Sequence, residues 1–294
     1  MPYATLDGIK THYTTQGSGP HLLMMAPRGF NSRIQSWDGG MWKEMDVFNA
    51  LSKHFTLIAY DRREAGLSGG RVEVLTWDVF AQHGKLLLDH LGVEKTWVIG
   101  PCMGVAVAAQ FGVRYPESCI GLMLPQPVGG HRWFTRLRSF FDRHVKFVRE
   151  NGLQAVVQRA TSEGKNFQDD PEAGPWATPI KNDAGFAARY VKQDVERYLN
   201  IVQASRDALF PSSDVSGPSA EDLMALEILC LVWSGDDASH ATSAAHQLRE
   251  LLSYVEYWDV NVAKQTHQGQ LEQILKFKAA VEAGSIVKKV VASR

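Results

Sequence analysis

The residues that decide the fold read TWVI at 96–99, GPCMG at 100–104 and VAVAA at 105–109. The first run is nearly all apolar, which is typical of a strand covered on both faces. The last run consists of small residues suited to a helix packed closely on a sheet. The two glycines of GPCMG leave room for the chain to reverse sharply over one residue, Cys102. Cys102 is therefore predicted to lie at the apex of a strand-to-helix turn.

Residues 1–125 alternate short apolar runs with stretches of helix length, which is the pattern of strands joined by crossover helices. Between 77 and 91 the apolar side chains fall roughly on one helical stripe, which Gly92 ends. Further buried strands are predicted at 21–26 (HLLMMA), 55–60 (FTLIAY) and 120–124 (IGLML). These elements together predict a parallel sheet.

The pattern changes in the middle of the chain. From 127 to 225 no clear strand occurs, and amphipathic helices alternate with proline-containing loops, which predicts a helical insertion. The α/β pattern returns with the apolar run 228–233 (ILCLVW) and the strand-like run 254–258 (YVEYW). We therefore expect a core in two parts, residues 1–126 and 226–294, with a helical cap (lid) at 127–225.

Charge and cysteine content limit the expected partners and compartment. The chain has 294 residues with 31 basic and 32 acidic side chains, so its net charge of −1 gives no electrostatic reason to bind nucleic acid or an anionic membrane. Three cysteines are too few for a disulfide framework, and no segment resembles a secretion signal or a membrane span. We expect a cytoplasmic protein that acts on a small molecule, with a homodimer as an open alternative to a monomer.

Two interpretations of Cys102 follow from its place at the turn. Its side chain would project at the carboxyl end of the sheet, beside the amino end of the next helix. The N–H groups and the dipole of that helix favour a thiolate and a developing oxyanion, so Cys102 would be a reactive nucleophile. A buried cysteine can instead be a small hydrophobic residue that only fills space.

Several segments together resemble the α/β-hydrolase superfamily. The turn at Cys102 is similar to its nucleophile elbow, G-x-S-x-G, with cysteine in place of serine. Residues 26–30 (APRGF) resemble its oxyanion-hole segment, residues 61–68 (DRREAGLS) its D-x-R-G-x-G-x-S turn, and residues 266–268 (THQ) its catalytic-histidine loop. The resemblance implies a mostly parallel, eight-stranded α/β-hydrolase sheet flanked by helices, with a helical cap insertion. It also favours the nucleophile interpretation of Cys102.

His267 is the base expected to activate Cys102, because a neutral imidazole suits this task near pH 7 and His267 lies in the segment that resembles the catalytic-histidine loop. The orienting acid is expected after the run 228–233. Asp237 is favoured there and Asp236 is the alternative, although either could instead cap a turn. The other histidines that fall on predicted helices are expected to be solvated: His83, His90, His240 and His246.

The resemblance implies that the backbone N–H groups of Phe30 and Met103 form an oxyanion hole. Three further side chains are candidates for substrate binding. Arg28 either binds a substrate carboxylate or pairs with a carboxylate of the protein. His131 lies at the mouth of the insertion, where it could line a pocket. Trp133 either lines an apolar pocket or belongs to the core of the cap.

These residues predict a hydrolase that needs no cofactor and no metal. Its expected substrate is an ester, a lactone or a related activated carbonyl, including a C–C bond beside a ketone. The resemblance implies a triad of Cys102, His267 and Asp237 and an acyl-thioester intermediate that water resolves. Two alternatives stay open: an acyltransferase or lyase on the same scaffold, and a catalytically silent homologue that binds a ligand.

Overall fold

The computed structural model describes residues 2–162, 164–211 and 216–285, and it contains an eight-stranded sheet of order β1-β2-β4-β3-β5-β6-β7-β8. β2 pairs antiparallel with β1 and β4, whereas the remaining neighbours pair in parallel. The expected eight-stranded, mostly parallel sheet is therefore confirmed. The strands are β1 (Tyr3–Leu6), β2 (Ile9–Gly17), β3 (His21–Met24), β4 (Thr56–Tyr60), β5 (Thr96–Ile99), β6 (Cys119–Pro125), β7 (Cys230–Trp233) and β8 (Val255–Tyr257).

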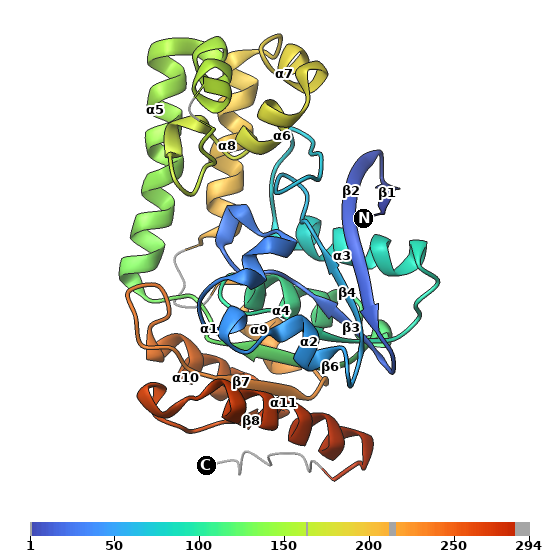
Figure 1. Ribbon diagram of the computed structural model, residues 1–294. Helices are drawn as coiled ribbons and strands as arrows, with labels where there is room; N and C mark the ends of the chain where they lie inside the picture. Colours follow the sequence, from blue (N-terminus) through green and yellow to red (C-terminus); the bar gives the residue numbers. More distant parts are fainter. Residues whose placement is uncertain (1, 163, 212–215, 286–294) are drawn as a thin grey trace.

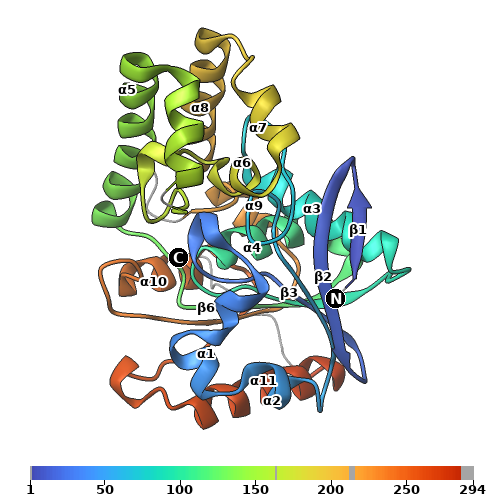
Figure 2. The same ribbon diagram turned by 45° about the horizontal axis from the view of Figure 1, so that its top comes forward.

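Helices cover both faces of the sheet (Figures 1 and 2). The side chains of a strand point alternately to the two faces, so on β3 Leu23 enters one core cluster, whereas Leu22 and Met24 enter the other. The first cluster includes residues of α3 (Trp77–His90), α4 (Gly104–Arg114) and α10 (Thr242–Leu251). The second includes residues of α1 (Gly40–Glu44), α2 (Val47–Leu51) and α11 (His267–Glu282). These continuous apolar strands are buried because both faces are covered.

The chain between β6 and β7 forms a helical layer on one side of the sheet, at the top of Figure 1. Its helices are α5 (His131–Ser162), α6 (Ala177–Asn182), α7 (Ala184–Tyr190) and α8 (Val195–Leu209), while α9 (Ala220–Ala225) lies back against α4 and α10. α5 is interrupted at Gly152, whose φ of 76° is not helical. Neither α5 nor any other helix in the described parts of the chain is long and apolar enough to cross a membrane.

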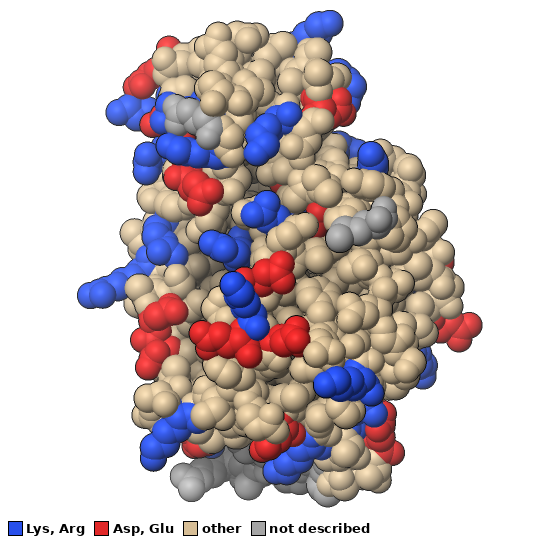
Figure 3. Space-filling model, viewed as in Figure 1, with Lys and Arg blue, Asp and Glu red and all other residues tan. Residues whose placement is uncertain are grey.

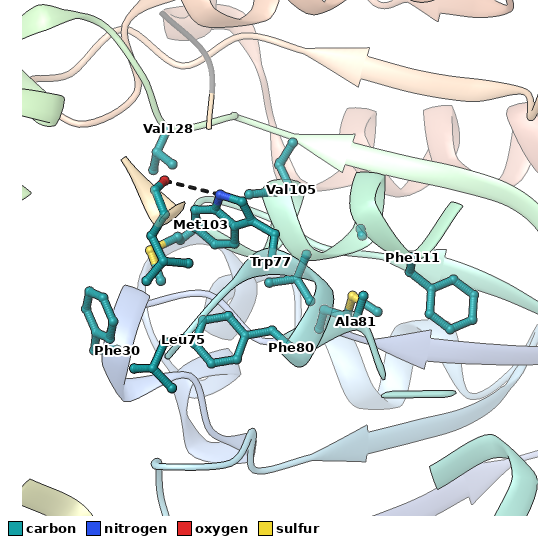
Figure 4. Packing of buried hydrophobic residues seen from close by; sticks show 14 of the residues in the cluster. Phe30, Leu75, Trp77, Phe80, Ala81, Met103, Val105, Phe111 and Val128 are labelled. Carbon is teal, nitrogen blue, oxygen red and sulfur yellow. Dashed lines mark hydrogen bonds between the residues drawn. The ribbon is translucent and has the colours of Figure 1, made fainter. Parts of the chain in front are cut away.

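Aromatic side chains fill the joint between the helical layer and the sheet. The ring of Phe30 makes edge contacts with three rings of the layer, at centroid distances of 5.0 to 6.3 Å: Phe141, Phe167 and Phe210. Trp77 packs edge-on against Phe210, and its indole N–H donates a hydrogen bond to the carbonyl oxygen of Leu209 at 3.1 Å, the dashed line in Figure 4. The joint is therefore well packed, and Phe30 is part of it.

Candidate active site

Cys102 lies at the turn between β5 and α4, with a φ of 59°, in the left-handed region that residues other than glycine rarely adopt. A Cβ atom at Gly100 would lie 2.2 Å from the carbonyl oxygen of Gly104. A Cβ atom at Gly104 would lie 2.5 Å from the carbonyl oxygen of Met25. Since neither position has room for a side chain, the two glycines are what permits the sharp turn at Cys102.

The imidazole beside the Cys102 thiol belongs to His240, in the loop after β7: both side chains line one cavity, and each shifts the pKa of the other. Nδ1 of His240 lies 2.8 Å from Oδ2 of Asp237. The other oxygen of the same carboxylate accepts the backbone N–H groups of Ser239 at 2.7 Å and of His240 at 2.9 Å. One short turn therefore carries both the imidazole and the carboxylate, and its hydrogen bonds fix the orientation of the ring.

The pKa shifts of these three groups all favour their charged forms. Burial raises the pKa of Cys102, but His240 and two backbone N–H groups outweigh burial and hold this pKa below its ordinary value. Burial lowers the pKa of His240, but Cys102 and Asp237 together raise it to about 9. Burial raises the pKa of Asp237, but its hydrogen bonds to His240 and to the N–H of Ser239 outweigh burial, so the pKa lies below its ordinary value. The arrangement thus favours a thiolate, an imidazolium and a carboxylate in series.

Gly235 determines where His240 lies, because a Cβ atom at Gly235 would be 2.6 Å from the Cβ atom of His240. We expect Gly235→Ala to displace the imidazole from Cys102 and to lower kcat/KM for an activated ester by about 10²-fold. Steady-state kinetics with a p-nitrophenyl ester measures the effect. The matched control is Gly185→Ala in α7, where the new methyl group would meet only the ends of flexible side chains. Unchanged kinetics in Gly235→Ala would contradict a catalytic role for His240.

The backbone N–H groups that approach the Cys102 sulfur are those of Met103 and Arg28. Met103 is one of the two oxyanion-hole donors expected from the sequence; Phe30, the other, is not among the groups that lower the pKa of Cys102, whereas Arg28 is. Arg28 has a φ of 78° and directly precedes the short 3-10 helix η1 (Gly29–Asn31), so the backbone turns at this residue. Which N–H group of neighbouring residues faces a site depends on such backbone angles, which the residue types alone do not determine.

The structure does not bring His267 to Cys102. Its Nε2 atom lies 3.0 Å from Oε2 of Glu44 on α1, its side chain is 44% exposed, and its Nδ1 atom has no hydrogen-bond partner among the described residues. The imidazole that contacts Cys102 is that of His240, which the sequence analysis expected to be solvated on a helix. His240 instead precedes α10 and forms an isolated bridge with Gly129. Its position three residues after Asp237 in a turn is the signal that could have identified it.

A cavity of about 390 Å³ opens at Cys102, and α1 forms part of its wall through Met41 and Trp42. Its described lining does not include Trp133 or His131. Trp133 is 4% exposed and packs edge-on against Phe134 and Phe210, so of its two interpretations the structure favours core packing. His131 borders a separate groove of about 860 Å³ that Asp237 also lines.

No cluster of three or more residues able to hold a metal ion occurs in the described ranges of the chain. The functional groups that the structure places at the site are the thiol of Cys102, the imidazole of His240 and the carboxylate of Asp237.

A family model described as alpha/beta hydrolase fold matches residues 29–156, the part of the chain that contains the turn at Cys102. The chain is therefore similar to this family over that part, and its strand order and the solved structures it resembles show the α/β-hydrolase fold. This similarity agrees with the resemblance seen in the sequence.

Two curated relatives and one solved structure illustrate the similarity. The chain is 26% identical over 255 residues to the dihydrolipoyllysine-residue acetyltransferase component of an acetoin cleaving system from Cupriavidus necator; the match covers 82% of this chain and 60% of that longer protein. It is 23% identical over 241 residues to 2-hydroxy-6-oxo-6-phenylhexa-2,4-dienoate hydrolase from Comamonas testosteroni. That match covers 79% of this chain and 76% of the hydrolase. The crystal structure of the enol-lactonase from Burkholderia xenovorans LB400 superposes on this chain with a TM-score of 0.56 at 18% identity. The superposition covers 96% of this chain and 98% of the enol-lactonase.

Proposed function

We propose that this protein is a hydrolase of esters or lactones, or of related activated carbonyl compounds, and that Cys102 is its nucleophile. The observation that carries the proposal is the chain of contacts from the Cys102 thiol through His240 to Asp237. A thiolate is a strong nucleophile and a good leaving group, and a neighbouring imidazolium keeps it ionised near neutral pH. In this proposal His240 replaces His267 as the base, while Asp237 keeps its expected role.

The reaction would proceed in two balanced steps. The Cys102 thiolate attacks the carbonyl carbon, a C–S bond forms, and the N–H groups of Arg28 and Met103 face the developing oxyanion. The imidazolium of His240 gives its proton to the leaving oxygen as the C–O bond breaks. Neutral His240 then takes a proton from water while the water oxygen attacks the thioester, and the thiolate leaves to restore the ion pair.

The comparisons support the reaction class without specifying the substrate. The names of two similar proteins describe a hydrolase of a 2-hydroxy-6-oxo-dienoate and an enol-lactonase, and both names denote hydrolysis of the type proposed. The name of another describes an acetyltransferase component, which keeps acyl transfer as the second candidate. Adding alcohol or amine acceptors separates the two candidates, because a transferase would divert product away from hydrolysis.

Trapping the acyl-enzyme tests the proposal. The protein is mixed with p-nitrophenyl acetate, quenched in acid during turnover and digested for mass spectrometry. We expect one acetyl group on Cys102 and none on Cys119 or Cys230, because burial raises the pKa of both other thiols. Turnover with Cys102 unmodified would contradict its role as nucleophile. The absence of both turnover and adduct would favour a silent, ligand-binding homologue.

A further inference from the structure

A second cavity, of about 300 Å³, lies next to the one at Cys102 and is lined almost entirely by polar side chains. We call it the basic cleft. It lies between the core and the helical layer and is lined by Arg28, Asn31, Arg33, Gly66, Gly164, Lys165, Asn166, Gln168, Asp169, Thr178, Lys181 and Asn182. Four of these side chains are basic and one is acidic, although the whole chain has a net charge of −1. The cleft is therefore a local concentration of positive charge (Figure 3 shows the distribution of charged side chains over one face).

Three of the four basic side chains of the cleft have no carboxylate partner among the residues that the structure describes. In the described parts of the chain, no carboxylate lies within ion-pair distance of Arg28, Arg33 or Lys181. Lys181 donates only to the carbonyl oxygen of Gly164, at 3.3 Å. The one acidic residue, Asp169, accepts the side-chain amide of Asn166 at 2.8 Å. Like charges in one cavity repel one another, and an anion from outside the chain would relieve that repulsion.

Arg28 connects the basic cleft to the candidate active site, since it lines both cavities. Its backbone N–H faces the sulfur of Cys102. Its guanidinium lies toward Gly39 in the wall of the Cys102 cavity, because a Cβ atom built at Gly39 would be 3.9 Å from Nη1 of Arg28. Arg28 is therefore the residue at which the cleft and the cavity at Cys102 adjoin.

We propose that the basic cleft binds a carboxylate of the substrate, so that this protein prefers esters or lactones whose acyl part ends in a carboxylate. In this proposal Arg33 and Lys181 bind the carboxylate within the cleft, and Arg28 contacts the part of the substrate between the cleft and Cys102. A guanidinium can donate two parallel hydrogen bonds to a carboxylate, which gives orientation as well as affinity. This inference rests on the proposed function for its catalytic part, but binding of an anion to the cleft can be measured without turnover.

Two substrates of matched length test the preference. Mono-p-nitrophenyl glutarate carries a terminal carboxylate, whereas p-nitrophenyl valerate ends in a methyl group at the equivalent position. We expect the ratio of their kcat/KM values to favour glutarate by about tenfold and to fall as salt is added, because salt screens exposed charges. In the double variant Arg33→Gln/Lys181→Gln this ratio should decrease to about one. The control Lys192→Gln removes an exposed cation that lines neither cavity and should keep the wild-type ratio.

Calorimetric titration with glutarate and with inorganic phosphate makes the test independent of catalysis. We expect the unmodified protein to bind glutarate, and the double variant to bind it at least about tenfold more weakly. A wild-type ratio of one or less, or a ratio that the double variant leaves unchanged, would overturn the proposal. Binding of phosphate without glutarate would overturn the assignment to a carboxylate. If no ester is turned over yet glutarate binds through Arg33 and Lys181, the anion site holds and the proposed hydrolase function fails.

Discussion

Replacing Cys102 with alanine is expected to lower kcat/KM for p-nitrophenyl esters by about 10³-fold or more, because the substitution removes the atom that forms the acyl-enzyme. Backbone N–H groups alone leave a small residual rate in such sites, so a complete loss is not required. Steady-state kinetics on purified protein measures the effect. The thermal unfolding midpoint should be little changed, because Cys102 makes no disulfide.

Cys119→Ala is the matched control, since Cys119 is 7% exposed on β6 and its thiol has a raised pKa. We expect it to keep kcat/KM within about twofold, even if the lost packing reduces stability slightly. Equal activity in Cys102→Ala and the wild-type protein would show that another group performs the chemistry. A loss of the same size in both variants would point to a general effect of removing thiols.

Replacing His240 with glutamine is expected to lower kcat/KM by about 10³-fold at pH 7, through loss of the ionised thiol and of the proton donor. Without the imidazolium the pKa of Cys102 rises, because burial raises it and the largest opposing interaction, that with His240, is lost. An ordinary thiol is only a few per cent ionised at pH 7. Iodoacetamide should therefore alkylate Cys102 about tenfold or more slowly in His240→Gln, and the rate should recover as the pH rises.

The pH profile of the wild-type protein gives an independent signature of His240. Activity should rise with pH as the Cys102 thiol ionises, at a pH below its ordinary pKa, and fall as His240 loses its proton near pH 9. The fall at high pH should be absent from the alkylation rate, which needs only the thiolate.

His267→Gln is the matched comparison for His240→Gln, because the sequence alone favoured His267 as the base. We expect it to change kcat/KM by less than about threefold, since the ring of His267 contacts Glu44 and is 44% exposed. A severe loss in His267→Gln with near-normal activity in His240→Gln would reverse the assignment. Such a result would mean that the loop carrying His267 moves to Cys102 during catalysis.

The fold and the place of Cys102 in it could be predicted from the residues of the chain. Strand-like apolar runs separated by helical stripes require a sheet covered on both faces, and this requirement does not depend on the path of the connecting loops. The turn at Cys102 was equally predictable, because only residues without a side chain fit where Gly100 and Gly104 approach the backbone. These features depend on periodicity and on local steric limits, which a single sequence displays directly.

The tertiary structure alone decided which groups surround Cys102. His240 and His267 both follow late strands, and only the path of the loops brings one imidazole to the thiol and the other to Glu44. The place of the Arg28 N–H beside Cys102 depended on a φ angle of 78°, and the basic cleft depended on residues of the helical layer lying near Arg28. The physical reason is that hydrogen bonds and ion pairs act over a few ångströms, whereas the residues that form this site are separated by long stretches of chain.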